Sequence, residues 1–206
     1  MAEILDDIDT LARGAAWLAA ADPGLARIAT PLPPLRRRAP GFATLLQAII
    51  GQQVSTASAA AIWARLEGAG LTAPAPVAAA GEEGLRACGL SRPKIRYALA
   101  LAEAGTDFDA LADLPDEEVI ARLVALPGIG RWTAEIYATV ALGRADVIPA
   151  GDLALQEATR LLYGLSERPS EAALRDRALA WSPWRGVAAR LLWAHYAVEK
   201  KREGVT

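Results

Sequence analysis

This chain of 206 residues has very little of several residue types. It has one cysteine, one histidine and only 6% aromatic residues. A single cysteine, Cys88, excludes a disulfide framework, a zinc finger and a four-cysteine iron–sulfur cluster. No apolar run approaches the roughly 20 residues of a membrane span, and the first residues lack the basic start of a signal peptide. These absences predict a cytoplasmic protein.

The chain also lacks an excess of positive charge. Lys and Arg together number 22 and Asp and Glu number 24, so the formal net charge is −2. This balance argues against a protein that nucleic acid holds mainly by bulk electrostatics, but it leaves room for a local site. Lysine is scarce, because Lys94, Lys200 and Lys201 are the only three. The run Arg36–Arg38 is either a solvated loop or a contact to phosphate.

Alanine and leucine dominate what is present, and this composition favours packed helices over strands. No alternating apolar–polar strand and no internal repeat can be recognised. Periodicity and Gly or Pro breaks predict helices over the following ranges: 3–21, 42–69 with an interruption near 51–53, 75–87, 92–104, 116–125, 131–142, 152–163, 170–181 and 185–202. The predicted fold class is all-α.

The most informative stretch is V-A-L-P-G-I-G-R-W-T-A, residues 124–134. One helix ends here and a second begins near Arg131, with a Pro-Gly-Ile-Gly turn between them. Gly128 and Gly130 leave their amide groups unshielded, so the turn and the helix start can bind a phosphate without a basic surface. An ordinary tight turn between two helices is the alternative explanation.

Asp152 stands at the start of a later helix, 22 residues after Gly130. Aspartate is a favoured N-cap, so capping alone explains its position. A carboxylate that is fixed at a helix start could also stabilise positive charge on a sugar or orient a water molecule. Asp146 is the weaker candidate for such a role.

The string L-P-G-I-G-x-x-T-A with an aspartate downstream resembles the helix-hairpin-helix (HhH-GPD) superfamily of DNA glycosylases. The resemblance implies that Asp152 is catalytic. It also implies that main-chain amides of the hairpin bind DNA phosphate, at Gly128, Gly130, Arg131 and Thr133. The main-chain carbonyls of Val124, Leu126 and Ile129 are implied to hold a structural Na⁺ or K⁺ ion. No other cofactor is expected, and the iron–sulfur cluster of some relatives is excluded.

Further strings resemble the 3-methyladenine glycosylase II branch, which repairs alkylated bases. GRWTAEIYATVALGRADVIPAGDLAL and WSPWRGVAARLLW carry this resemblance, and it implies a substrate pocket of Trp132, Tyr137 and Trp184. Trp132 stands where lyase relatives have a lysine, so a Schiff-base lyase is not expected. IIGQQVS resembles the segment that enters DNA, with Gln52 and Gln53 as contacts and Gln53 in the plugging place.

Together these features predict a two-lobed helical glycosylase fold with the DNA cleft between the lobes and no N-terminal sheet domain. Residues 42–146 would form the lobe that ends in the hairpin, and residues 1–41 plus 147–206 the lobe that carries Asp152. The expected activity is monofunctional hydrolysis that releases flipped-out alkylated purines from duplex DNA, by a monomer. A glycosylase for uracil, hypoxanthine or ethenoadenine, or a non-catalytic DNA-binding module, are the alternatives.

Overall fold

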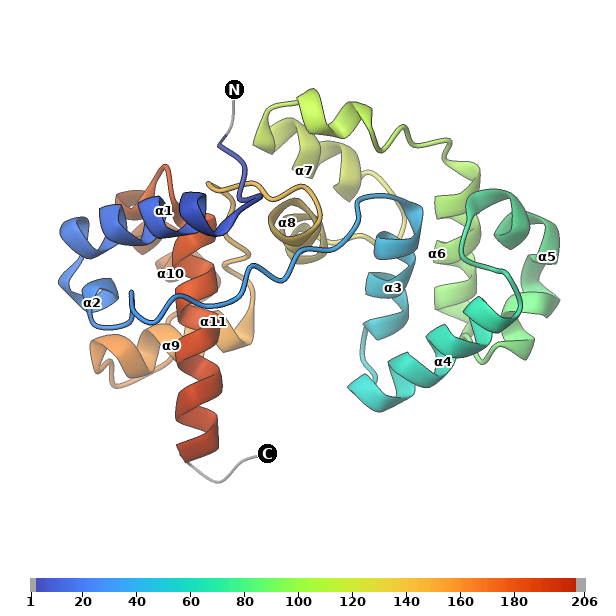
Figure 1. Ribbon diagram of the computed structural model, residues 1–206. Coiled ribbons are helices and arrows are strands. Elements are labelled where there is room, and N and C mark those ends of the chain that lie inside the picture. Colours follow the sequence, from blue (N-terminus) through green and yellow to red (C-terminus); the bar gives the residue numbers. More distant parts are fainter. Residues whose placement is uncertain (1–2, 203–206) are drawn as a thin grey trace. The chain divides into compact units, whose positions relative to one another are not determined.

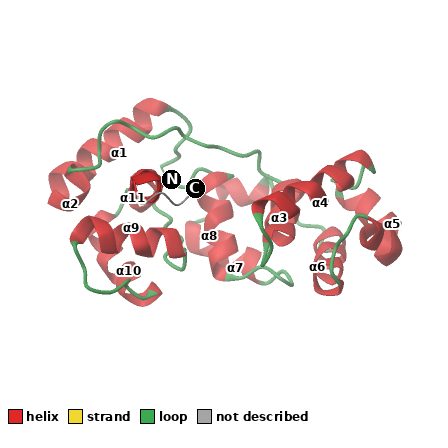
Figure 2. Cartoon of the chain, turned by 90° about the horizontal axis from the view of Figure 1, so that it is seen from below, coloured by secondary structure: helices red, strands yellow, loops and turns green. Residues whose placement is uncertain are grey.

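The computed structural model describes residues 3–202, and their regular secondary structure is helical. One isolated antiparallel bridge, between Ile4 and Arg144, is the exception within this range. The predicted all-α class is therefore confirmed (Figures 1 and 2). The elements are α1 (Ile8–Ala21), α2 (Pro23–Ala26), α3 (Phe42–Gly51), α4 (Thr56–Gly68), α5 (Pro74–Ala87), α6 (Arg92–Glu103), η1 (Ala110–Asp113), α7 (Asp116–Val124), α8 (Arg131–Val140), α9 (Leu153–Tyr163), α10 (Glu171–Arg177), η2 (Ala178–Trp181) and α11 (Arg185–Arg202).

The first helix begins later than the predicted residue 3. Asp7 is its N-cap, because its carboxylate accepts a hydrogen bond of 2.7 Å from the Thr10 amide. The residues before it pair with another segment instead, and the Leu5 amide donates to the carbonyl of Gly143 at 2.7 Å. Periodicity alone extended the helix across this capping residue, so the prediction was wrong there.

The chain divides into two compact units. One contains the chain up to Arg37 together with the chain from Ala138 onward, and the other is Arg38–Tyr137. The change from one unit to the other falls inside α8. The limits expected from the sequence for the hairpin lobe, residues 42 and 146, stay a prediction.

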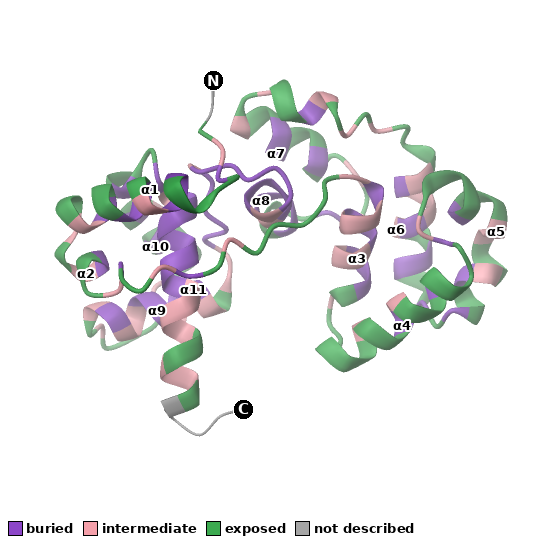
Figure 3. Ribbon diagram, viewed as in Figure 1, coloured by how far each residue is buried: buried purple, intermediate pink, exposed green. Residues whose placement is uncertain are grey.

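The unit that contains both chain ends is built around α11. Its buried residues include much of α11 from Gly186 to Leu192, together with the apolar faces of α1 and α9 (Figure 3). Gly14 of α1 allows a close approach, since a Cβ there would lie 2.6 Å from the ring of Trp184. Small residues therefore let the helices of this unit pack tightly around large ones.

The other unit packs α6 against α3 and α5. Leu45, Leu46 and Ile49 of α3 are fully buried, and Ala98 of α6 is equally inaccessible. Within residues 3–202, none of the helices combines the length and apolar character that crossing a bilayer requires.

Candidate functional site

The hairpin between α7 and α8 has the turn that the sequence predicts. Gly128 has a φ of 84°, a conformation that favours glycine. A Cβ at Gly128 would lie 2.3 Å from the ring of Tyr97 on α6. Both the backbone conformation and the packing therefore require glycine at this position.

Gly130 has a different surrounding from Gly128. Its carbonyl accepts from the amide of Ala134 at 3.0 Å, so it immediately precedes the first turn of α8. A Cβ at Gly130 would meet nothing within 4 Å. The first amides of a helix have no acceptor within that helix, and they carry the positive end of its dipole. The backbone at Gly130 is thus open to an approaching anion.

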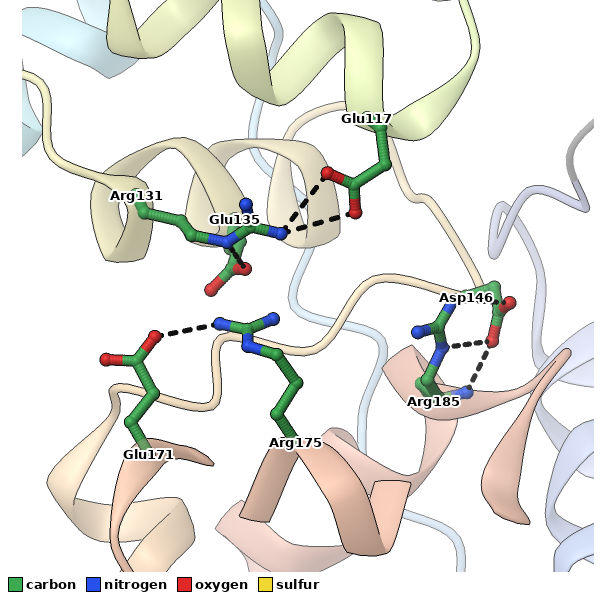
Figure 4. A network of polar contacts seen from close by, with 7 residues as sticks. All are labelled: Glu117, Arg131, Glu135, Asp146, Glu171, Arg175 and Arg185. Carbon is green, nitrogen blue, oxygen red and sulfur yellow. Dashed lines mark hydrogen bonds and ion pairs between the residues drawn. The ribbon is translucent and has the colours of Figure 1, made fainter. Parts of the chain in front are cut away.

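Three side chains of the first turn of α8 have different environments. The Arg131 guanidinium contacts Glu135 at 2.9 Å and Glu117 at 3.2 Å (Figure 4). Thr133 is buried, whereas the Trp132 side chain is 44% exposed. Arg131 has its charge balanced by carboxylates, so it and Thr133 are suited to contact DNA through their amides.

The turn after α3 is attached to the hairpin. The side-chain amide of Gln52 donates to the carbonyl of Gly128 at 2.9 Å. Gln53 is exposed and has a φ of 55°, which is uncommon for a residue with a side chain. The ammonium group of Lys94 donates to the carbonyl of Ile50 at 2.7 Å, and its burial lowers the pKa of Lys94. The structure thus brings the two predicted DNA-contacting segments together. The hydrogen bond from Lys94 supports the end of α3, which precedes Gln53.

Tyr137 is buried inside the unit formed by residues 38–137. Its hydroxyl oxygen accepts from the amide of Gly41 at 2.7 Å, just before α3, and its ring lies 6.2 Å from that of Phe108. Burial raises the pKa of the Tyr137 hydroxyl above its usual range. Its observed contacts are structural, and its predicted role in the substrate pocket stays a prediction.

Asp152 is the N-cap of α9 in the other unit. Its Oδ1 atom accepts from the amides of Ala154 and Leu155, each at 3.0 Å. The indole N–H of Trp193 on α11 donates to the same oxygen at 3.2 Å. The carboxylate is therefore fixed by two amides and by an aromatic side chain from a second helix.

Asp146, the weaker candidate, forms a structural ion pair. Its carboxylate receives two hydrogen bonds of 2.9 Å from the guanidinium of Arg185 (Figure 4). The hydroxyl of Ser182 also donates to it, at 2.8 Å. A carboxylate held in such a bidentate pair has its charge balanced within the protein. This arrangement favours Asp152 as the carboxylate that acts on a substrate.

Trp184 lies in the core of its unit. It is only 9% exposed and belongs to the same buried cluster as Val187. Its contacts with α1 explain its presence without a ligand, so a role in the pocket stays a prediction.

Sequence reasoning assigned no role to three residues that support the site, namely Tyr97, Lys94 and Trp193. Each acts through a residue far away in the sequence: Tyr97 under Gly128, Lys94 at the end of α3, and Trp193 on Asp152. No local pattern marks such contacts, because helical spacing does not say which distant element a side chain meets.

A helical fold with this hairpin and a capped aspartate downstream defines a class of DNA repair proteins. The family model of the HhH-GPD superfamily base excision DNA repair protein matches residues 46–183. The chain belongs to this superfamily.

Particular relatives indicate the branch. The chain is 32% identical over 161 residues to DNA-3-methyladenine glycosylase 1 of Schizosaccharomyces pombe, covering 74% of this chain and 71% of that protein. A crystal structure of DNA-3-methyladenine glycosidase from Bacillus halodurans has a TM-score of 0.81 at 30% identity, covering 98% of this chain and 94% of that one. The S. pombe 3-methyladenine DNA glycosylase in complex with abasic DNA has a TM-score of 0.75 at 29% identity, covering 88% and 95%.

These relatives confirm the alkylation-repair branch that the sequence predicts. Other curated relatives are longer, and the chain spans 55% of the length of DNA-3-methyladenine glycosylase 2 of Escherichia coli.

Proposed function

We propose that this protein is a monofunctional DNA glycosylase that removes alkylated purines from duplex DNA. The observation that carries the proposal is the Asp152 carboxylate, fixed at the start of α9 by three hydrogen bonds. The relatives named after 3-methyladenine support the substrate class.

Asp152 would act on the sugar of the damaged nucleotide. The bond between C1′ and the base nitrogen breaks, the electron pair leaves with the base, and positive charge develops on the sugar. A carboxylate that is already oriented stabilises this charge without reorganisation during the reaction. Water then adds to C1′ and releases one proton to the solvent, and the products are the free base and an abasic site. The nucleotide must leave the stack to reach the carboxylate, so base flipping is part of the proposal.

Trp132 supports alkylated purines as substrates. Its exposed indole can attract a cationic or electron-poor base through its π face. Such a base is already a good leaving group, so a strong general acid is unnecessary.

The lysines support hydrolysis rather than lyase chemistry. Lys94 is buried and bound to a carbonyl, and Trp132 occupies the place of the lyase lysine in relatives. A Schiff base needs an accessible amine beside the sugar, and neither of these two residues provides one.

The hairpin would hold the DNA backbone, and the protein would act as a monomer. Open backbone at Gly130 and the start of α8 suit a phosphate group. The carbonyls of Val124, Leu126 and Ile129 would hold a Na⁺ or K⁺ ion that rigidifies the turn. The Leu126 carbonyl already accepts from the Ile129 amide at 3.1 Å, and its second lone pair suits a cation.

One experiment tests the proposed function. Methylated duplex DNA is incubated with the protein, released bases are identified by chromatography, and strand breaks are scored on a gel before and after alkali. We expect free 3-methyladenine or 7-methylguanine, and strand breaks only after alkali. Breaks without alkali would contradict the monofunctional assignment, and the release of no methylated base would contradict the substrate class.

A further inference from the structure

Two arginines of the loop before α3 lie close to a buried arginine of α11. The guanidinium of Arg190 donates to the carbonyl of Arg36 at 3.2 Å and to the carbonyl of Thr139 at 3.5 Å. Arg37 donates to the carbonyls of Leu5 and Ala141 at 2.7 and 2.9 Å. The loop is thus tied down through main-chain oxygens, while the side chains of Arg36 and Arg37 remain exposed.

Together with Arg144, Arg190 is one of two arginines within residues 3–201 that are buried. Arg190 is 5% exposed, and its Nε atom has no hydrogen-bond partner. Burial, and next the positive charges of Arg37 and Arg36, lower the pKa of Arg190 to about 10, so it stays protonated at neutral pH. Within residues 3–202, no carboxylate forms an ion pair with any of these three arginines.

A buried charge is normally compensated by a partner of opposite sign. Even Arg131, which is exposed, and Arg185, which is partly buried, each contact a carboxylate. The cluster of Arg36, Arg37 and Arg190, which we call the arginine cluster, does not. An anion that binds to the arginine cluster from the solvent would lower the electrostatic energy of this uncompensated charge.

Arg36 has a second unusual feature. Its φ is 45°, a left-handed conformation that residues with side chains seldom adopt. Such conformations persist where the surroundings impose them, and they concentrate at functional sites. Here the guanidinium of Arg190 donates to the carbonyl of Arg36, and the neighbouring Arg37 donates to the carbonyls of Leu5 and Ala141. These hydrogen bonds fix the conformation of the loop.

We propose that the arginine cluster binds a phosphodiester group of the DNA backbone, as a phosphate site additional to the hairpin. Arg36 and Arg37 contact the phosphate oxygens. The buried Arg190 adds positive charge and fixes the loop through the carbonyl of Arg36. Guanidinium groups match the geometry of phosphate oxygens better than ammonium groups do. The inference rests on the proposed function in one respect, since DNA is the ligand.

The test measures how salt affects the affinity for an undamaged duplex. Fluorescence anisotropy gives the binding constant of the whole protein between 50 and 200 mM salt, on the scale where counterion release is usually followed. Arg36→Gln should reduce the slope of log K against log salt by about 0.9, the value for one phosphate contact. At roughly 0.1 M salt the same loss makes binding about eightfold weaker.

Two further variants control for charge and for folding. Arg168→Gln removes the same charge from an exposed arginine of the same unit, and it should leave the slope unchanged. Arg36→Lys keeps the charge and should restore most of the slope. Melting temperatures of all three variants should match that of the wild type.

Different outcomes distinguish the possible errors. If Arg36→Gln and Arg168→Gln have the same slope as the wild type, the arginine cluster is not a DNA contact, even where the wild type excises methylated bases. If millimolar inorganic phosphate raises the melting temperature of the wild type but not of Arg36→Gln, and the DNA slope is unchanged, the site takes free phosphate and the DNA assignment is overturned. A wild type that binds no duplex overturns both this inference and the proposed function.

Discussion

Alanine in place of each of the two hairpin glycines should affect different properties: DNA affinity at Gly130 and the stability of the fold at Gly128. At Gly130 an added methyl group meets nothing within 4 Å, so Gly130→Ala should fold with a stability within about 0.5 kcal/mol of the wild type. The same methyl group would stand where a phosphate approaches the start of α8. Losing one charge-assisted hydrogen bond costs about 1.5–3 kcal/mol, which weakens DNA binding roughly tenfold or more.

Gly128→Ala should instead destabilise the fold. Its φ of 84° costs an alanine about 1–2 kcal/mol, and the overlap with the ring of Tyr97 at 2.3 Å adds about 1–3 kcal/mol. For a chain of this size the melting temperature should fall by an amount on the order of 10 °C.

The assay combines calorimetry with duplex binding for both variants. Gly68→Ala on α4 is the matched control, since a methyl group there also meets nothing within 4 Å and lies outside the hairpin. It should change neither DNA affinity nor the fold. Wild-type affinity of Gly130→Ala would refute the hairpin as the phosphate site, and an unchanged melting temperature of Gly128→Ala would refute its packing against Tyr97.

Three further predictions concern side chains. Trp132→Ala should lower kcat/KM for alkylated purines by an amount equivalent to about 1–3 kcal/mol of transition-state stabilisation, the scale of base–aromatic stacking. Trp132→Lys should be worse, because a lysine repels a cationic base. Equal activity of the wild type and both variants would show that Trp132 is not part of the pocket. Borohydride should trap no Schiff base in the wild type. Trp193→Phe deletes the indole donor to Asp152 and should lower kcat about fivefold with KM unchanged, consistent with the loss of about 1 kcal/mol, whereas a purely structural role would lower the melting temperature and leave kcat intact. Burial raises the pKa of Asp22, but hydrogen bonds from two side chains and two amides outweigh it and lower the pKa below 3.8. The stabilisation is therefore full above pH 3.8 and is lost as the pH falls through the folded pKa. Asp22→Asn should accordingly destabilise the protein at about pH 7 and much less once the pH is below the folded pKa, as urea titrations would measure.

Local signals in the sequence predicted most of the helices. Gly, Pro and capping residues mark their ends, which is why α3, α6 and α11 start where expected. The short elements α2 and η1 were missed, because four residues cannot show a helical period.

The site was predicted as far as its chemistry is carried by single residues. The hairpin glycines and Asp152 have local signatures, namely a turn and an N-cap, and the structure places them accordingly. The contact from Gln52 to Gly128 and the support of Asp152 by Trp193 depend on packing between distant segments. The sequence already favoured Asp152 over Asp146, but the ion pair that occupies Asp146 depends on Arg185, which lies 39 residues later.

The most direct test of the account is the excision rate of Asp152→Asn under single-turnover conditions. Asparagine keeps the shape of the side chain and can still cap α9, but it lacks the negative charge. We expect release of methylated purines to slow by roughly 10²–10³-fold, with duplex affinity close to that of the wild type. An Asp152→Asn protein that excises at nearly the wild-type rate would show that Asp152 only caps a helix and that the catalytic carboxylate lies elsewhere.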